Sequence, residues 1–279
     1  TYRPYQHMLQ PTITSVKTSI DLYPERKTYA IKGSYTLVNK NSQPIDSLLL
    51  YCDRRVTLET VQIQNAKLVK NDSASGHRLY QLITALQPGD SISMEFTMAY
   101  SWSPYNRHDA QNAIVDNGAF MRISRYYPVF GYQSNNEIDN EAERKKRNMA
   151  TATPLKKLED SVIAEYGFIE FEALISTTEK QIAIGTGELV KSWTTNSRNY
   201  YQYKTPTPIP FRFAVSSARY AVKKASQDGI DILVYYHPAH AENVPEPEGQ
   251  ATMTADRFAD EPHDDHASTP TEDAIDRIL

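Results

Sequence analysis

Hydrophobic and polar residues alternate along much of this chain in short segments. The alternation begins at Ile13 and continues to Trp102, and turn-forming stretches interrupt it. One of them, residues 24–27, joins two alternating segments in a predicted hairpin. A second series of alternating segments covers residues 168–241. A period of two is typical of half-buried β-strands, and short strands at this spacing favour an antiparallel β-sandwich. The pattern therefore predicts a mainly β chain with two β sets, 13–102 and 168–241, after a lead-in at 1–12.

The residues between the two β sets, 103–167, follow neither a strand pattern nor a long helical one. They are rich in aromatic side chains grouped around Gly118, Pro128 and Gly131. Aromatic side chains bury large areas, whereas glycine and proline favour turns. We therefore expect a compact, ordered connector with one short helix within 137–148. The simplest interpretation is a structural corner between two β layers, although loops of this length are often functional.

Composition and charge narrow the class of protein. The chain has 279 residues, of which 40% are hydrophobic and 23% charged, as in globular proteins. A net charge of -4 gives no electrostatic reason to expect a nucleic acid partner. No run of eighteen apolar residues occurs, so we expect no membrane-spanning segment in this chain. Residues 242–279 are acidic and poor in large apolar side chains, which predicts a flexible tail.

Residues with catalytic or metal-binding chemistry are sparse. Cys52 is the only cysteine and follows an apolar run, so we interpret it as a buried apolar residue. The zinc-binding pattern His-Glu-x-x-His is absent. The nearest groups are His237-Pro-Ala-His240 and His263-Asp-Asp-His266, which we interpret as solvated polar residues. The residues themselves therefore predict a non-catalytic β module with no catalytic residue and no metal site.

Four stretches of the sequence match a known pattern in order. Val16-Lys-Thr-Ser-Ile-Asp-Leu-Tyr-Pro-Glu-Arg-Lys-Thr-Tyr and then Ile31-Lys-Gly-Ser-Tyr-Thr-Leu resemble the opening strands of the N-terminal domain of M1-family zinc aminopeptidases. Tyr126-Tyr-Pro-Val-Phe-Gly-Tyr occupies the place of that family's Phe-Pro-Cys-Phe-Asp-Glu-Pro segment. Together with Ile232-Leu-Val-Tyr-Tyr-His-Pro-Ala-His, it resembles the variant in which an M1-like peptidase is fused to a bacterial ABC-2-type permease. The resemblance covers roughly residues 11–245.

This resemblance implies a fold and a set of partners. The fold would be a saddle-shaped β domain that leans on a thermolysin-like catalytic domain of the same parent chain. The zinc would belong to that catalytic domain, so the resemblance implies no cofactor in this chain. It also implies peptide as a ligand of the parent. For the permease variant, the parent would be membrane-bound and this chain would lie on the extracytoplasmic, periplasmic side.

The resemblance also implies roles for residues of the connector. In the family, one Gln or Glu of the N-terminal domain reaches the amino end of the substrate, and Asn117 lies near that position. We expect Asn117 at the edge of the substrate cleft, with a turn-forming Asn-Gly pair as the alternative. An exposed apolar patch would dock the catalytic domain. We expect that patch to contain Phe120, Tyr126, Tyr127 and Phe130.

Three hypotheses about function follow. The first is an accessory domain of an M1-like metallopeptidase that shapes the peptide cleft and is inactive alone. The alternative is a free-standing β-sandwich module that binds carbohydrate or protein, which an exposed row of coplanar aromatic rings would favour. An intact enzyme with an unrecognised site would need clustered titratable groups in a cleft, and nothing in the sequence supports it.

Overall fold

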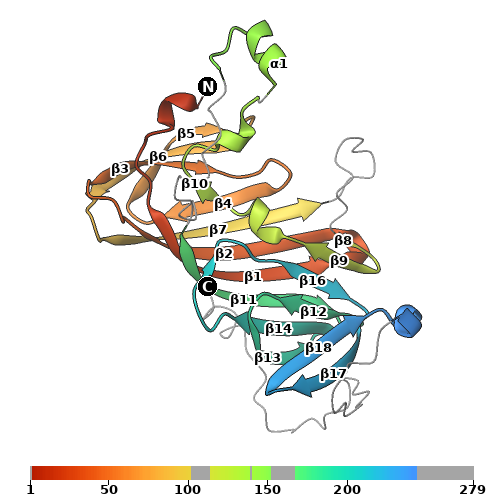
Figure 1. The fold of residues 1–279 in the computed structure, drawn as a ribbon. Helices are drawn as coiled ribbons and strands as arrows, with labels where there is room; N and C mark the ends of the chain where they lie inside the picture. Colours follow the sequence, from red (N-terminus) through yellow and green to blue (C-terminus); the bar gives the residue numbers. More distant parts are fainter. Residues whose placement is uncertain (1, 102–113, 139, 152–166, 244–279) are drawn as a thin grey trace.

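The computed structural model describes residues 2–101, 114–138, 140–151 and 167–243. Strands make up most of these residues, and almost all strand pairs are antiparallel, so the predicted mainly β fold is confirmed (Figure 1). Most of the predicted flexible tail, residues 244–279, lies outside the described residues, as do residues 102–113 and 152–166 of the connector.

The largest sheet has eight strands. Its order is β13-β14-β11-β1-β2-β7-β4, and a short strand, β15 (Ile209–Pro210), pairs with the start of β11. The strands of this main sheet are β1 (Thr12–Tyr23), β2 (Thr28–Val38), β4 (Thr57–Ile63), β7 (Ser91–Ser101), β11 (Phe168–Thr178), β13 (Glu188–Thr195) and β14 (Arg198–Lys204).

The two β sets expected from the sequence share this main sheet. β1 and β2 form the hairpin predicted across residues 24–27, with Tyr23 opposite Thr28. The other edge of β1 pairs in parallel with β11, with Ser15 opposite Glu170 and Asp21 opposite Ser176. The first and second β sets are therefore joined by backbone hydrogen bonds across the middle of one sheet.

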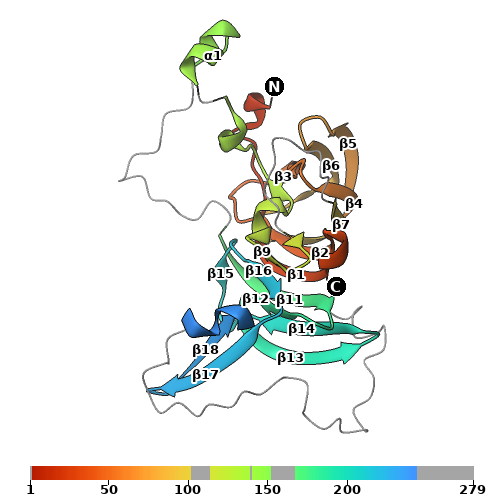
Figure 2. The same cartoon turned by 90° about the vertical axis from the view of Figure 1, so that its right-hand side faces the viewer.

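Two four-stranded sheets and one ribbon complete the fold, and residues of the connector contribute to both sheets. The ribbon diverges from β13 and β14 (Figure 2). One sheet has the order β10-β3-β6-β5, with strands β10 (Val129–Phe130), β3 (Ile45–Tyr51), β6 (His77–Leu86) and β5 (Ala66–Asp72). The other has the order β12-β16-β9-β8, with strands β12 (Ile182–Gly185), β16 (Val215–Ala218), β9 (Gly118–Met121) and β8 (Ile114–Val115). The ribbon consists of β17 (Ala221–Gln227) and β18 (Ile230–Tyr236).

The helices of the described residues are short. The predicted helix within 137–148 is shorter than expected, α1 (Glu141–Lys146), because the side chain of Asn140 caps it by accepting a hydrogen bond from the Glu143 amide at 3.1 Å. The remaining helices are 3-10 turns, η1 (Arg3–Tyr5), η2 (Pro24–Arg26), η3 (Ile123–Tyr126), η4 (Ser134–Asn136) and η5 (Pro238–Asn243). None of the helices in the described part of the chain is long and apolar enough to cross a membrane.

The buried side chains form one continuous cluster that includes residues of all three larger sheets. The alternation along β1 shows how side chains of the main sheet contribute to this core cluster. Val16, Ile20 and Leu22 are at most 1% exposed, whereas Lys17 between them is exposed. In β1 the period of two places these apolar side chains on one face of the sheet, where they join the core cluster.

The long strands at the edges of the sheets carry interruptions in pairing. β4 has a register shift at Glu59, β5 has one at Val69, and β13 has one at Val190. An extra residue of this kind, a β-bulge, bends the strand and disturbs the row of free backbone groups. The bulges therefore make these edges poor templates for pairing with another chain.

Candidate cleft edge and docking residues

Asn117 lies at the tip of a tight hairpin formed by β8 and β9. Val115 pairs with Gly118, which leaves Asp116 and Asn117 as an exposed two-residue turn. Neither Asn117 nor Gly118 has the left-handed backbone that glycine usually provides. Instead, a Cβ on Gly118 would lie 2.5 Å from the carbonyl oxygen of Ser217. Close packing of β9 against β16 therefore explains this glycine, and Asn117 itself lies in the turn, as the alternative for the Asn-Gly pair expected.

A buried polar network holds this turn from behind. The Gln181 side chain is 2% exposed and donates from Nε2 to the Asp116 carbonyl at 3.1 Å. Its Oε1 accepts a hydrogen bond from the Ser217 hydroxyl at 2.8 Å and lies 3.4 Å from Oγ1 of Thr177. The two hydroxyls are also 2.9 Å apart and hydrogen-bonded to each other. Because every member of the network has a partner, the position of the turn that carries Asn117 is fixed by the core.

Of the four aromatic residues expected in the docking patch, only Phe120 is exposed. Phe120 is 79% exposed, the largest value for an apolar side chain in the described residues. Tyr126, Tyr127 and Phe130 are 7%, 1% and 7% exposed. The expected exposed patch is therefore wrong for these three rings. All three belong to the core cluster: Tyr127 contacts the main sheet, and Phe130 lies on β10, which pairs with β3.

Tyr127 shows how the connector is built into the core. Its ring contacts Phe96 and Phe213 edge to face, with centroids 5.7 and 4.9 Å away. Its hydroxyl is 2.6 Å from Oγ1 of Thr18 on β1. Burial raises the pKa of Tyr127 well above its ordinary value, so the hydroxyl stays protonated. The sequence interpretation of this stretch as a structural corner therefore holds for Tyr127.

A second part of the connector is held by a buried arginine. Arg144 of α1 is 2% exposed, and its Nη1 donates to Oε2 of Glu137 at 2.7 Å. The same guanidinium donates to the carbonyls of Ile138 and Ala150. Glu137 also accepts a hydrogen bond from the Tyr132 hydroxyl. Arg144, the first of four consecutive basic residues at 144–147, therefore closes the segment by bonding carbonyls on both sides of α1.

The other residues with catalytic or metal-binding chemistry, Cys52 and the histidines, form no common site within the described residues. Cys52 is 5% exposed, and burial raises the pKa of its thiol to about 12, which suits an apolar residue and not a nucleophile. The rings of His237 and His240 are 5.8 Å apart beside η5. The described residues contain no group of three or more His, Cys, Asp or Glu side chains that could hold a metal ion. His263 and His266 lie outside the described residues.

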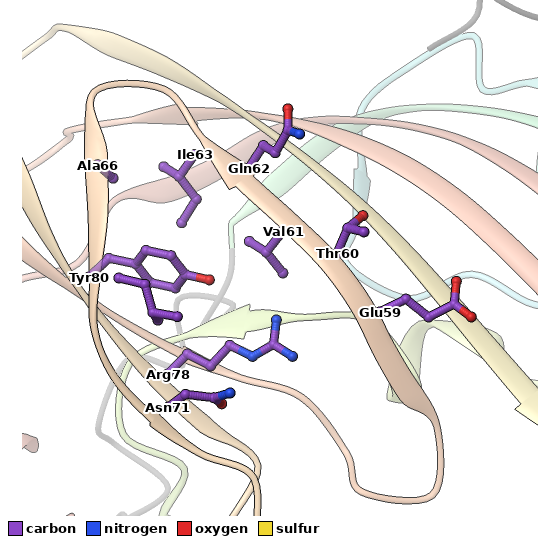
Figure 3. Close-up of a pocket in the computed structure, with 10 residues that line it drawn as sticks. Glu59, Thr60, Val61, Gln62, Ile63, Ala66, Asn71, Arg78 and Tyr80 are labelled. Carbon is purple, nitrogen blue, oxygen red and sulfur yellow. The ribbon is translucent and has the colours of Figure 1, made fainter.

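A groove of about 590 Å³ opens between β4 and the sheet that contains β5 and β6 (Figure 3). Val61, Ile63 and Tyr80 form part of its lining. Arg78 reaches across the groove and donates from Nη2 to the Leu58 carbonyl at 2.8 Å. Its guanidinium group thus links β6 to β4 of the main sheet. None of the residues singled out in the sequence lines this groove.

The stacked rings of Trp193 and Tyr200 are half-buried and do not form the exposed platform that a carbohydrate-binding module would need. Trp193 and Tyr200 are opposite each other on β13 and β14, and their rings stack at 5.3 Å with an angle of 5°. Lys191 lies over the Trp193 ring, with Nζ 5.3 Å from its centroid. The faces of the Trp193 ring are therefore in contact with this chain's own side chains.

Comparisons with known proteins place this geometry in context. No family model and no curated protein sequence matches the chain. Solved structures do match. A mutant M1 zinc metallopeptidase from Deinococcus radiodurans bound to a Tyr-Ser-Ala substrate has a TM-score of 0.58 and 10% identity, over 86% of this chain and 51% of that one. The fold of this chain is thus similar to that of about half of an M1 zinc metallopeptidase.

Two further structures agree with this fold similarity. A two-domain M1 zinc metallopeptidase mutant bound to L-tryptophan has a TM-score of 0.57 and 11% identity, over 86% of this chain and 51% of that one. The M1 zinc metallopeptidase from Deinococcus radiodurans has a TM-score of 0.52 and 10% identity, over 81% and 46%. The chain thus spans about half the length of the solved structures that it matches. At these identities the likeness concerns the fold.

Proposed function

We propose that this chain is the accessory N-terminal domain of an M1-like metallopeptidase, shapes one wall of its peptide cleft and has no activity alone. The observation that carries the proposal is the match of 86% of this chain to 51% of a metallopeptidase that binds a peptide. The other half of the parent would contain the zinc and the catalytic residues. This chain would supply binding surface and orientation.

The geometry around Asn117 supports a role at the edge of the cleft. The turn is exposed, and the buried Gln181 network fixes its backbone. A group held in this way can contact a substrate without losing much conformational freedom on binding. Asn117 offers one carboxamide oxygen as an acceptor and one NH₂ group as a donor, which suits the polar ends of a peptide. We propose that Asn117 orients the substrate and takes part in no chemical step.

The proposal is tested by comparing this chain with its full-length parent. Both are purified, their zinc content is measured, and hydrolysis of aminoacyl-anilide substrates is assayed in the same samples. We expect stoichiometric zinc and turnover from the parent, and neither from this chain after incubation with zinc. Turnover by this chain at stoichiometric zinc would overturn the proposal, and so would a parent with no zinc peptidase region.

We also propose that the parent is a membrane protein of the ABC-2-type permease class, with this chain on the extracytoplasmic side. The support is the sequence resemblance carried by the Tyr126-Tyr-Pro-Val-Phe-Gly-Tyr segment and the end of β18. Membrane fractionation followed by protease treatment of spheroplasts and of inverted vesicles tests this. Cleavage of this chain in spheroplasts alone supports the assignment, and recovery of the intact parent in the soluble fraction contradicts it.

A further inference from the structure

His77 lies buried at the start of β6 with one of its two ring nitrogens hydrogen-bonded. It is 7% exposed, and Nδ1 lies 3.1 Å from both the carbonyl oxygen and the hydroxyl oxygen of Ser75. Within the described residues, Nε2 is buried and has no hydrogen-bond partner. Because a carbonyl can only accept, Nδ1 carries the proton of the neutral ring, and Nε2 is an unprotonated lone pair. Protonation of Nε2 would bury a charge and an N–H group without an acceptor, which costs free energy.

The N-terminal segment covers the ring of His77. Tyr2 stacks on this ring with centroids 4.0 Å apart and an angle of 11° between the planes, and Tyr51 of β3 contacts it at 5.0 Å. Tyr2 is itself 7% exposed. Its hydroxyl donates to Oδ2 of Asp72 on β5 at 2.7 Å. The stack and this hydrogen bond together hold the segment that contains η1 against the β10-β3-β6-β5 sheet.

The next residue of the N-terminal segment binds a different part of the molecule. Arg3 donates from Nη1 to the Thr151 carbonyl at 3.3 Å. Thr151 ends the α1 segment, which we define as residues 140–151. In both views of the fold, η1 lies between α1 and the side of the sheet formed by β5 and β6 (Figure 1, Figure 2). Tyr2 and Arg3 therefore connect the sheet to the α1 segment.

The charged and titratable groups around His77 come from the N-terminal segment, from β5, and from β3 with the turn that follows it. They are Tyr2, Lys70, Asp72, Tyr51, Asp53 and Arg54. Asp72 favours a charged imidazole, because it pairs with His77 in register across β5 and β6. Lys70 places a positive charge over the Tyr2 ring, with Nζ 5.4 Å from its centroid. The two charges nearest to the stack are thus of opposite sign.

Burial outweighs these charges. It lowers the pKa of His77 below the ordinary value, and the hydrogen bond with the Ser75 carbonyl and the charge of Asp72 offset only part of this effect. A ring released into water would titrate near the ordinary value of 6.5. Attachment of Tyr2 is therefore complete above pH 6.5 and weakens as the pH falls through 6.5 toward the lowered pKa of the stacked ring. Asp72 stays ionised in this range, because hydrogen bonds from Tyr2 and Ser75 lower its pKa.

We propose that Tyr2, Arg3 and His77 form an acid-released clip, which holds the α1 segment to the β10-β3-β6-β5 sheet at neutral pH and opens when His77 is protonated. A charged ring needs water or an acceptor at Nε2, and its burial under Tyr2 provides neither. The segment that contains η1 would then leave the sheet, and Arg3 would no longer bind the Thr151 carbonyl. This inference does not depend on the proposed function, because it uses contacts within this chain.

The test compares hydrogen exchange of the full-length protein at about pH 7.5 and about pH 5, with each rate divided by that of an unstructured chain at the same pH. The reporters are the amides of Tyr5, Gln6 and Met8, which donate to carbonyls of the same segment. A difference of about half a pKa unit between the attached and released forms changes attachment about threefold. We therefore expect protection of these amides to be at least about threefold lower at the acidic pH, and protection of β1 to stay unchanged.

Two variants identify the titrating group. His77→Phe keeps a ring on which Tyr2 can stack but has no nitrogen to protonate, so the pH dependence of protection should vanish. His7→Gln is the matched control, because His7 is an exposed histidine of the same N-terminal segment, and it should keep the pH dependence. A fall in protection of the same size in His77→Phe as in the unmodified protein would overturn the proposal. Equal protection of the unmodified protein at both pH values would do the same.

A third variant keeps the test decisive if His77→Phe does not fold. Tyr2→Ser removes the stack, so the N-terminal segment should be unprotected at both pH values. The ring of His77, followed by NMR, should then titrate closer to 6.5 than in the unmodified protein. An unchanged titration of His77 in Tyr2→Ser would show that Tyr2 does not control its protonation, and would overturn the clip. Circular dichroism of each variant checks that the sheets still form.

Discussion

Gln181 and Asp116 are 65 residues apart in sequence, yet the side-chain amide of Gln181 donates to the Asp116 carbonyl at 3.1 Å. This hydrogen bond joins the second β set to the connector at the turn that carries Asn117. The Gln181 side chain is buried, so its amide cannot exchange this bond for one with water. The placement of an exposed candidate residue thus depends on a buried side chain that sequence inspection did not single out.

Replacing Gln181 with alanine should destabilise the chain by about 1 to 3 kcal/mol, because the Asp116 carbonyl loses its buried donor. Hydrogen exchange at residues 114–121 should also become faster. The matched control is Gln62→Ala, since Gln62 is exposed on β4, and it should change the free energy of unfolding by less than about 0.5 kcal/mol. Chemical denaturation of both variants provides the measurement. Equal stabilities would show that the network does not hold the turn.

Two aromatic residues of the connector should behave differently when truncated. Tyr127→Ala should cost about 3 to 5 kcal/mol, because it leaves a cavity among Phe96, Phe213 and Thr18. Phe120→Ala should change the stability of this chain by less than about 0.5 kcal/mol, because Phe120 is exposed. Thermal unfolding of the two variants under the same conditions tests this difference in stability. Similar losses of stability would contradict the burial described above.

Arg144→Ala should loosen the segment around α1. Its removal takes one donor from the Glu137 carboxylate, which keeps its hydrogen bond from Tyr132, and takes the Arg144 donor from the carbonyls of Ile138 and Ala150. Breaking a buried ion pair typically costs about 3 to 5 kcal/mol. Limited proteolysis with trypsin should then cut at Lys145, Lys146 or Arg147 faster than in the unmodified chain. Lys145→Ala, at the adjacent exposed position, is the control and should leave cleavage at the two other sites nearly unchanged.

The same ion pair predicts a dependence of stability on pH. Hydrogen bonds from Tyr132 and Arg144 lower the pKa of Glu137 below its ordinary value of 4.5. A lowered pKa means that the stabilisation is fully present above that ordinary value. It is lost as the pH falls through the folded-state pKa. Denaturation midpoints between about pH 3 and pH 7 should therefore decline less steeply in Glu137→Gln than in the unmodified chain. Parallel profiles would refute this assignment.

In the full-length parent, Asn117→Ala should raise KM for aminoacyl-anilide substrates by about three- to tenfold with little change in kcat, if the side chain orients substrate by one hydrogen bond. Asp116→Ala, at the neighbouring turn position, is the control and should leave KM nearly unchanged. Steady-state kinetics of both variants tests this. A fall in kcat with constant KM would assign Asn117 a different role.

Much of the fold could be predicted because it depends on local patterns. The alternation at Val16, Ile20 and Leu22 and the turn after Tyr23 were enough to predict the β1–β2 hairpin, which forms as expected. The interpretation of Cys52 as a buried residue was also correct, since it follows a run of apolar residues on β3. In these cases, the residues that decide the structure are close together in the sequence.

The parts that could not be predicted depend on contacts between distant segments. Phe120 and Tyr127 are both large aromatic residues in the sequence, and only the crossing of the connector over the main sheet buries Tyr127. Arg144 resembles its basic neighbours, and its burial follows from carbonyls at Ile138 and Ala150 that surround it in three dimensions. The composition of a segment therefore predicted that it was ordered, but not which side chains remain available to a partner.

The parallel pairing of β1 with β11 has a consequence for synthesis of the protein in the cell. Asp21 and its partner Ser176 are 155 residues apart, so one edge of β1 stays open until the ribosome has produced most of the chain. At ordinary elongation rates this interval lasts about 10 to 30 s. During that time the apolar face of the β1–β2 hairpin lacks its final cover. Nascent chains should therefore depend on chaperones more than their finished stability would suggest.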